Sequence, residues 1–159
     1  MKIEKKFLKK NHMTRCLCKL KEVRYILIKD FFSKKVSLDE EYSYIINLES
    51  QDEIYYSVHF LIGVDGKCVN IIPEDEVTYS TRNIELNYYV ISIECCINEN
   101  GEFSLQTIDT LIKLINFLKK KYNISKDNIL LDNDLTGSRN PIFYVDNRYK
   151  FLEILEKIS

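Results

Sequence analysis

Short runs of β-branched and aromatic residues recur along the chain and predict the strands of a sheet. The dipeptide Asp65-Gly66, between the second and third runs, is a strong signal for a two-residue hairpin turn. The expected strands cover residues 23–28, 54–62, 68–72, 89–95 and 128–131.

Apolar residues spaced three and four positions apart predict three helices. The first, over residues 37–49, opens with Ser37 and Glu40 at the spacing of a capping box. The second covers residues 104–123 and gathers lysines at its C-terminal end, where the helix dipole favours them, and the third covers residues 148–158. Because helices alternate with strands around one hairpin, we expect an α/β fold with a single mixed central β-sheet flanked by helices.

Composition limits both the number of domains and the class of partner. The 159 residues contain no repeat or linker, so we expect one domain over residues 1–159, with residues 1–22 as an N-terminal arm packed on it. The net charge of −1 gives no reason to expect a nucleic-acid partner. The basic N-terminus lacks the apolar core of a signal peptide, and no run reaches the length of a membrane span, so we expect a cytoplasmic protein.

The five cysteines are an odd number and show no CxxC spacing, so reduced thiols are expected. Cys95 and Cys96 lie in a predicted strand without a histidine partner, which favours buried, unreactive thiols. Cys16 and Cys18 lie in the polar arm and are expected to be the most exposed.

Several stretches together resemble one known family. The stretch "SVHFLIGVDGKCVNIIPEDEVTY" resembles the central hairpin of the zinc-dependent N-acetylmuramoyl-L-alanine amidases of the amidase-2, or peptidoglycan-recognition-protein, fold, and "ISIECC" is similar to the strand that carries their catalytic glutamate. The remaining landmarks of the phage-endolysin branch are matched, in order, by "FLKKNHMTR", "VRYILI", "GEFSLQTIDTLIKLINFLKKKYNIS" and "DLTGSRNPIFYVDN". The resemblance therefore covers almost the whole chain.

The resemblance implies hydrolysis of the bond between the lactyl group of muramic acid and L-alanine, by a zinc ion held by two histidines and a cysteine or aspartate. At the three matching positions this chain has Lys29, Asp132 and Asn140. A protonated lysine has no lone pair, and a neutral amide oxygen is a poor zinc ligand. We therefore expect no zinc or other cofactor, and we expect the Lys29 ammonium to pair with Asp132 where the metal would lie.

The resemblance also assigns the remaining site positions. Glu94 matches the catalytic general base, and Ser80, Ser138 and Arg139 fall on the substrate side, with Ser80 in place of a histidine. Without a metal-bound water Glu94 has nothing activated to deprotonate. A structural role for Glu94, as a hydrogen-bond acceptor from Lys29 or Arg82, is therefore at least as strongly expected.

Two other polar features have ordinary structural explanations. His59 lies in the middle of a predicted strand and is expected to pack in the core, whereas His12 is expected to be solvated. Asp132 and Asp134 do not follow the calcium-binding EF-hand pattern, so a polar loop capped by Gly137 is expected instead.

These replacements favour a catalytically inactive, zinc-less amidase homologue that acts as a binding or regulatory module. It could hold a muramyl-peptide fragment in the retained groove, or bind a protein partner, including a second copy of itself, with the groove closed by the shortened loop after Tyr79; the second form is slightly favoured. No separate cell-wall-binding domain is expected. The alternative is an active peptidoglycan amidase, metal-free or with an unusual metal, that uses Glu94 as general base.

Overall fold

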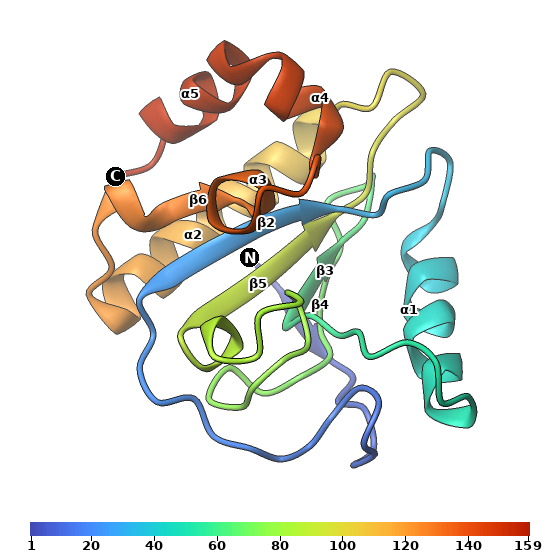
Figure 1. Ribbon diagram of the computed structural model, residues 1–159. Coiled ribbons are helices and arrows are strands. Elements are labelled where there is room, and N and C mark those ends of the chain that lie inside the picture. Colours follow the sequence, from blue (N-terminus) through green and yellow to red (C-terminus); the bar gives the residue numbers. More distant parts are fainter.

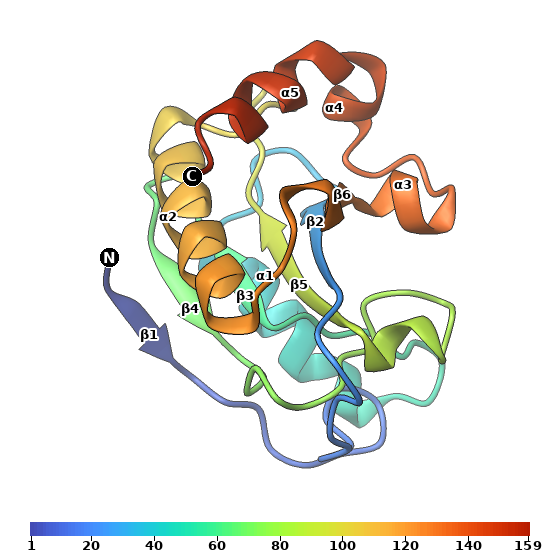
Figure 2. The same cartoon turned by 90° about the vertical axis from the view of Figure 1, so that its left-hand side faces the viewer.

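The computed structural model describes residues 1–159 and contains one six-stranded sheet with helices on both faces (Figures 1 and 2). The strand order is β1-β4-β3-β5-β2-β6, and only β3 and β4 pair antiparallel. The expected α/β fold with a single mixed sheet is confirmed. The strands are β1 (Ile3–Lys5), β2 (Tyr25–Asp30), β3 (Phe60–Ile62), β4 (Cys68–Asn70), β5 (Val90–Cys95) and β6 (Ile129–Leu131).

Helix α1 (Leu38–Asn47) covers one face of the sheet, whereas α2 (Leu105–Tyr122) and α5 (Arg148–Glu156) cover the other (Figures 1 and 2). The predicted capping box is confirmed, because the Ser37 hydroxyl accepts from the Glu40 N–H at 3.1 Å and the Glu40 carboxylate accepts from the Ser37 N–H at 2.9 Å. The sequence did not predict the short helices α3 (Asp132–Thr136) and α4 (Ile142–Asp146). Single 3₁₀ turns span Leu48–Ser50, Leu86–Tyr88 and Lys126–Asn128.

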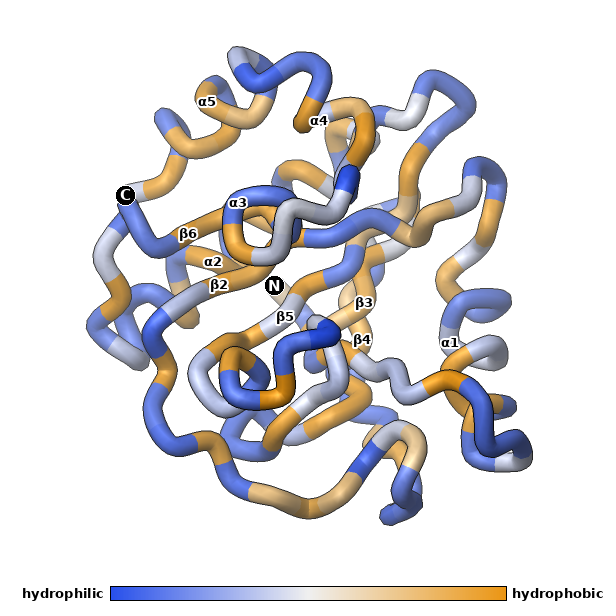
Figure 3. Tube along the Cα trace, in the orientation of Figure 1, coloured by the Kyte–Doolittle hydropathy of each residue, from blue (hydrophilic) through white to orange (hydrophobic).

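Apolar side chains form one cluster on each face of the sheet. The larger cluster includes Ile26 and Ile28 of β2 together with Leu114 of α2, and the smaller one includes Leu61 of β3 and Ile45 of α1. In Figure 3 hydrophobic residues follow the central strands, and they alternate with hydrophilic residues along α5. Because successive strand residues point to opposite faces, the residue after Ile28 points toward the α1 side of the sheet.

The long strand expected over residues 54–62 is wrong for its first six residues. Their backbone groups bond in turn to three separate segments: the Tyr56 N–H donates to Met13, the Ser57 N–H to Tyr79 and the His59 N–H to Ser92. This segment packs against several neighbouring segments, and it does not belong to one continuous strand paired with a single neighbour. Strand β2 likewise begins at Tyr25 and continues to Asp30, two residues later than expected at each end.

The turn between β3 and β4 is one residue longer than the expected two-residue turn. The Gly66 N–H donates to the Gly63 carbonyl at 3.0 Å, which makes Val64 and Asp65 the central residues, and Gly66 follows with φ +81°. This is the turn in which a glycine takes the left-handed position after two right-handed residues.

The N-terminal arm contributes β1, which pairs with β4 at the edge of the sheet. A three-residue edge strand has too few positions to show a periodic pattern, so no strand was predicted there. None of the helices combines the length and the apolar character needed to cross a membrane.

Candidate functional site

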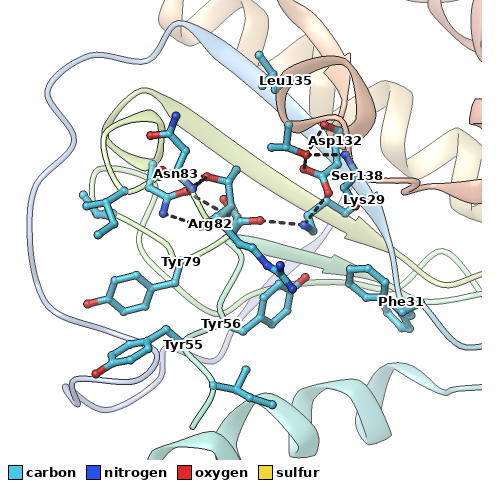
Figure 4. A pocket seen from close by; sticks show the side chains of 18 of the residues that line it. Lys29, Phe31, Tyr55, Tyr56, Tyr79, Arg82, Asn83, Asp132, Leu135 and Ser138 are labelled. Carbon is cyan, nitrogen blue, oxygen red and sulfur yellow. Dashed lines mark hydrogen bonds and ion pairs between the residues drawn. The ribbon is translucent and has the colours of Figure 1, made fainter. Parts of the chain in front are cut away.

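A cleft of about 1740 Å³ lies on the α1 face of the sheet. Figure 4 shows Lys29 and Asp132 at one end, Tyr55 and Tyr79 at the other, and Arg82 reaching between them. Residues 79–84 line this cleft and do not fill it. The expectation that the loop after Tyr79 closes the groove is therefore wrong.

Lys29 and Asp132 form a buried ion pair at the end of the cleft, which confirms the predicted pairing. Lys29 Nζ lies 3.1 Å from Asp132 Oδ2, and the two side chains are only 5% and 3% exposed. Lys29 Nζ also donates to the Ser80 carbonyl at 2.8 Å, and the Thr136 hydroxyl lies 3.1 Å from the second oxygen of Asp132. Both charges are thus hydrogen-bonded as well as paired, as burial requires.

Asn140, the third former metal position, makes no side-chain hydrogen bond to this ion pair and is engaged with Asp30 instead. Its amide Nδ2 donates to Asp30 Oδ1 at 2.7 Å, and its Oδ1 accepts from the Asp30 N–H at 3.0 Å. Asp30 follows Lys29 in β2, so its side chain leaves the strand toward the opposite face. Burial raises the pKa of Asp30, while hydrogen bonds from the Phe32 N–H and Asn140 oppose that rise.

The three substrate-side positions have different surroundings. Ser80 is buried and reaches the site through its backbone carbonyl, because its hydroxyl accepts from Thr78 at 3.2 Å. Ser138 lines the cleft beside Asp132, where Figure 4 shows it. Arg139 does not line the cleft, and its exposed guanidinium pairs with Asp146 at 2.8 Å.

Glu94 lies behind the cleft and is fully buried. It occupies the position in β5 directly opposite Lys29 in β2, yet it accepts a hydrogen bond from the Tyr56 hydroxyl rather than from Lys29 or Arg82. The expected hydrogen bond from Lys29 or Arg82 is therefore wrong, because Lys29 is already held by Asp132 and Ser80.

The second carboxylate oxygen of Glu94 is buried without a hydrogen-bond partner, and the carboxyl group of Glu41 in α1 is its nearest like charge. Burial, and then the charge and hydrogen bond of Glu41, raise the pKa of Glu94 well above its usual range. Burial also raises the pKa of Glu41. Two buried carboxyl groups close to each other cannot both be ionised at low cost, so the proximity favours the protonated form of one of them.

His59 has the structural role expected of it. The Ser92 N–H donates to His59 Nδ1 at 3.0 Å, so the ring proton is on Nε2, which lies 2.8 Å from the Glu76 carbonyl. Burial lowers the pKa of His59 to about 4 and keeps the ring neutral. Cys95 and Cys96 are also buried as expected, and burial raises the pKa of both thiols.

The stretch from Asp132 to Thr136 forms helix α3, so the polar loop expected there is wrong. The Asp134 carboxylate accepts from the Leu131 N–H at 2.9 Å, and Gly137 ends the helix at φ +76°, as a capping glycine does. The helix directs Asp132 toward Lys29.

Three residues that surround the predicted ones were not predicted from the sequence: Glu41, Tyr56 and Asp30. A signal for Glu41 was present, because it lies three residues after Leu38 and four before Ile45, on the buried face of α1. It was obscured by the acidic first turn, where carboxylates are expected for the helix dipole.

Comparisons with known proteins agree on one family. The fold is similar to that of the catalytic domain of XlyA, with a TM-score of 0.82 at 20% identity over 100% of both chains. It is also similar to a mutant endolysin from Bacillus subtilis, with a TM-score of 0.81 at 22% identity over 100% of this chain and 99% of that one. Among curated proteins, N-acetylmuramoyl-L-alanine amidase CwlL from Bacillus licheniformis is 26% identical over 174 residues, covering 100% of this chain. The chain spans less than half the length of such curated relatives, 44% and 47% in two of them. A family model described as "N-acetylmuramoyl-L-alanine amidase" matches residues 20–141, well over half of the chain, which therefore belongs to the Amidase_2 family.

Proposed function

We propose that this chain is a catalytically inactive, zinc-less member of its family that binds a muramyl-peptide fragment in the open cleft without cleaving it. The observation that carries the proposal is the ion pair between Lys29 and Asp132, at two of the three positions that match zinc ligands.

The donor groups at these positions do not fit a zinc ion. The Lys29 ammonium carries a positive charge and offers only donors, all directed to protein oxygens within 3.1 Å or to the Tyr56 and Phe32 rings about 5.6 and 5.5 Å away. The Asn140 amide is engaged with Asp30 on both its atoms. One carboxylate, Asp132, remains, and it is already neutralised by the lysine.

Glu94 is also poorly suited to act as a general base. A base must reach the proton it removes, but Glu94 is fully buried and does not line the cleft. One of its oxygens accepts from Tyr56, and the other has no hydrogen-bond partner, with the Glu41 carboxyl group raising the pKa of Glu94 further after burial. These contacts support a structural role in joining α1 to β5.

The cleft still offers groups that can bind a ligand. Arg82 is exposed, lines the cleft and makes no ion pair, so it is free to bind a ligand carboxylate. Tyr55 and Tyr79, whose ring centroids are 5.7 Å apart, form an aromatic wall at the end of the cleft away from Lys29 and Asp132. An open cleft with unengaged groups favours a ligand in the groove over the closed, protein-binding form.

Calorimetry with N-acetylmuramoyl-L-alanyl-D-isoglutamine tests binding, and muropeptide release from cell walls tests cleavage. We expect saturable binding that Arg82→Ala weakens at least several-fold, and no released muropeptide. Arg24→Ala is the matched control, because Arg24 is exposed, pairs with Glu22 at 2.7 Å and lies outside the cleft. Stoichiometric zinc together with cleavage that Glu94→Gln abolishes would overturn the proposal in favour of the active amidase.

A triple variant tests the assignment of the three positions. Lys29→His, Asp132→His and Asn140→Cys together supply two imidazoles and a thiolate, which is the three-ligand set of a catalytic zinc site with its fourth position open. We expect this variant to bind one zinc ion and the natural chain to bind none under the same conditions. Failure of the folded variant to bind zinc would show that the three positions are assigned wrongly.

A further inference from the structure

Cys16 and Cys18 lie on a tight turn in which the Cys18 residue folds back against the side chain and the carbonyl of Cys16. Leu17 between them has φ +62°, a left-handed conformation that is unfavourable for a branched side chain. The Cys18 N–H donates to Cys16 Sγ at 3.3 Å, and Cys18 Sγ lies 3.9 Å from the Cys16 carbonyl. These two thiols are only half-buried, whereas the other three cysteines are buried.

Three polar groups lie beside the Cys16 sulfur. The first is the Cys18 N–H, which donates to this sulfur, and the second is the Cys18 thiol, which donates to the Cys16 carbonyl and whose pKa is raised by the neighbouring Cys16 side chain and then by burial. The third is the Tyr79 hydroxyl, whose pKa is raised by burial and then by its hydrogen bond to Cys16. The backbone donor to Cys16 and the raised pKa of the Cys18 thiol favour Cys16 as the attacking sulfur and Cys18 as the thiol that retains its proton.

The surrounding contacts hold this turn in place. The Cys18 carbonyl accepts from the Val77 N–H at 2.8 Å. Arg15 binds Glu76 through two nitrogens, each 2.8 Å from a carboxylate oxygen, and the side chains of this pair are only 17% and 7% exposed. The thiol pair therefore belongs to an ordered part of the domain and not to a loose arm.

Both thiols line the large cleft beside Tyr79, so a small molecule can reach them. A metal site is not favoured, because no third His, Cys, Asp or Glu side chain joins them to complete a ligand group. Thiol exchange needs only the two sulfur atoms and access for a small disulfide.

We propose that Cys16 and Cys18 form a redox-active dithiol that reduces low-molecular-weight disulfides entering the cleft. The Cys16 thiolate attacks one sulfur of the small disulfide, forms a mixed disulfide and releases the first thiol, which takes up the proton that Cys16 lost. Cys18 then loses its proton and attacks Cys16 Sγ, which forms the Cys16–Cys18 bond and releases the second thiol with that proton. The protein loses two electrons and two protons, and the small disulfide gains both.

Incubation of the intact chain with oxidised glutathione tests this reaction by thiol counting and intact mass. We expect the natural chain to lose two of its five thiols, to lose the mass of two hydrogens and to retain no glutathione. Cys18→Ser should retain one glutathione on Cys16, because the second thiol is missing. Cys16→Ser should react several-fold more slowly, because the pKa of the Cys18 thiol is raised.

Tyr79→Phe removes one donor to Cys16 and should slow the first step several-fold at neutral pH. Tyr55→Phe is the matched control, because it removes a hydroxyl from the neighbouring ring and leaves the donors to Cys16 in place. Stable glutathione adducts on the natural chain without an internal disulfide would overturn the proposal. Equal reaction rates for the half-buried pair and the three buried thiols would also overturn it, because Cys16 would then show no specific reactivity. Neither result depends on whether the chain binds or cleaves a muramyl peptide.

Discussion

Replacing Asp132 by asparagine removes one charge of the buried ion pair and keeps the shape of the side chain. In the natural protein Asp132 Oδ2 lies 3.1 Å from Lys29 Nζ, with almost no solvent reaching either side chain. The asparagine can still offer an amide oxygen to the ammonium, but the positive charge loses its counter-charge. Lys29→Met is the stronger change, because it leaves a buried carboxylate and removes the donor to the Ser80 carbonyl.

The two changes should differ in magnitude. Asp132→Asn keeps an oxygen acceptor for the ammonium but removes its counter-charge, so its cost should lie below that of deleting a partner, at about 1.5–3 kcal/mol. Removing one partner of a buried pair costs about 3–5 kcal/mol, which is the loss expected for Lys29→Met. The double variant Lys29→Met, Asp132→Leu replaces both charges by apolar groups, and its unfolding free energy should return to within about 1 kcal/mol of the natural value.

Urea unfolding of the four proteins measures these differences, and equal m-values would show that the same surface is exposed in each. The control pair is Lys113 and Asp109, whose atoms are closer, at 2.6 Å, but whose side chains are 56% and 63% exposed. Asp109→Asn should cost only about 0.3–0.5 kcal/mol, the value for an exposed helical pair. A similarly small loss for Asp132→Asn would refute the reasoning, because burial rather than distance is held to set the energy.

Three further predictions concern buried polar groups near the cleft. Burial raises the pKa values of Glu41 and Glu94 above the ordinary 4.5, so the unfolding free energy should fall as the pH rises above that value. Glu41→Gln should flatten this fall in urea titrations at several pH values, and an unchanged slope would contradict the raised pKa values. Burial lowers the pKa of His59 from 6.5 to about 4, so its ring should stay neutral in an NMR titration until about pH 4. The unfolding free energy should fall as the pH falls from 6.5 toward 4, and an NMR midpoint near 6.5 would contradict the burial of the ring. Asn140→Ala removes both hydrogen bonds to Asp30 and should cost about 1–3 kcal/mol in urea unfolding, and a loss within error would mean that water replaces the amide.

Local patterns were sufficient to predict most of the sheet and the longer helices. The helical spacing of apolar residues gave α2 (Leu105–Tyr122) and α5 (Arg148–Glu156), and runs of β-branched residues gave β5 (Val90–Cys95) almost to the residue. These elements bury one continuous face or lie fully inside the sheet, so the spacing of their apolar residues in the sequence matches the surface that they bury. The pairing of Lys29 with Asp132 was also predictable, because the resemblance had already placed the two positions together.

Contacts between distant segments were not predictable in the same way. Glu41 meets Glu94 only because α1 crosses the sheet at that point, and neither residue carries a local sign of the other. Tyr56 reaches Glu94 from a segment that looked like a strand but bonds to several neighbours. The pair formed by Cys16 and Cys18 was not predicted for another reason. Its spacing differs from CxxC, and a pattern of apolar residues does not indicate the left-handed conformation of Leu17 that shapes this turn.

The replacements around the cleft depend on one another, and this limits how a zinc site could be recovered. Restoring only a histidine at Lys29 would remove the ammonium and leave Asp132 buried with no positive charge beside it. Restoring only a histidine at Asp132 would leave the ammonium unpaired next to an imidazole, and a cysteine at Asn140 would take both hydrogen bonds from Asp30. Each single reversal therefore lowers stability before any metal ligand set is complete. Only the three changes together exchange the lysine charge for that of a zinc ion, which is why the triple variant, and no single variant, is the informative test of the site.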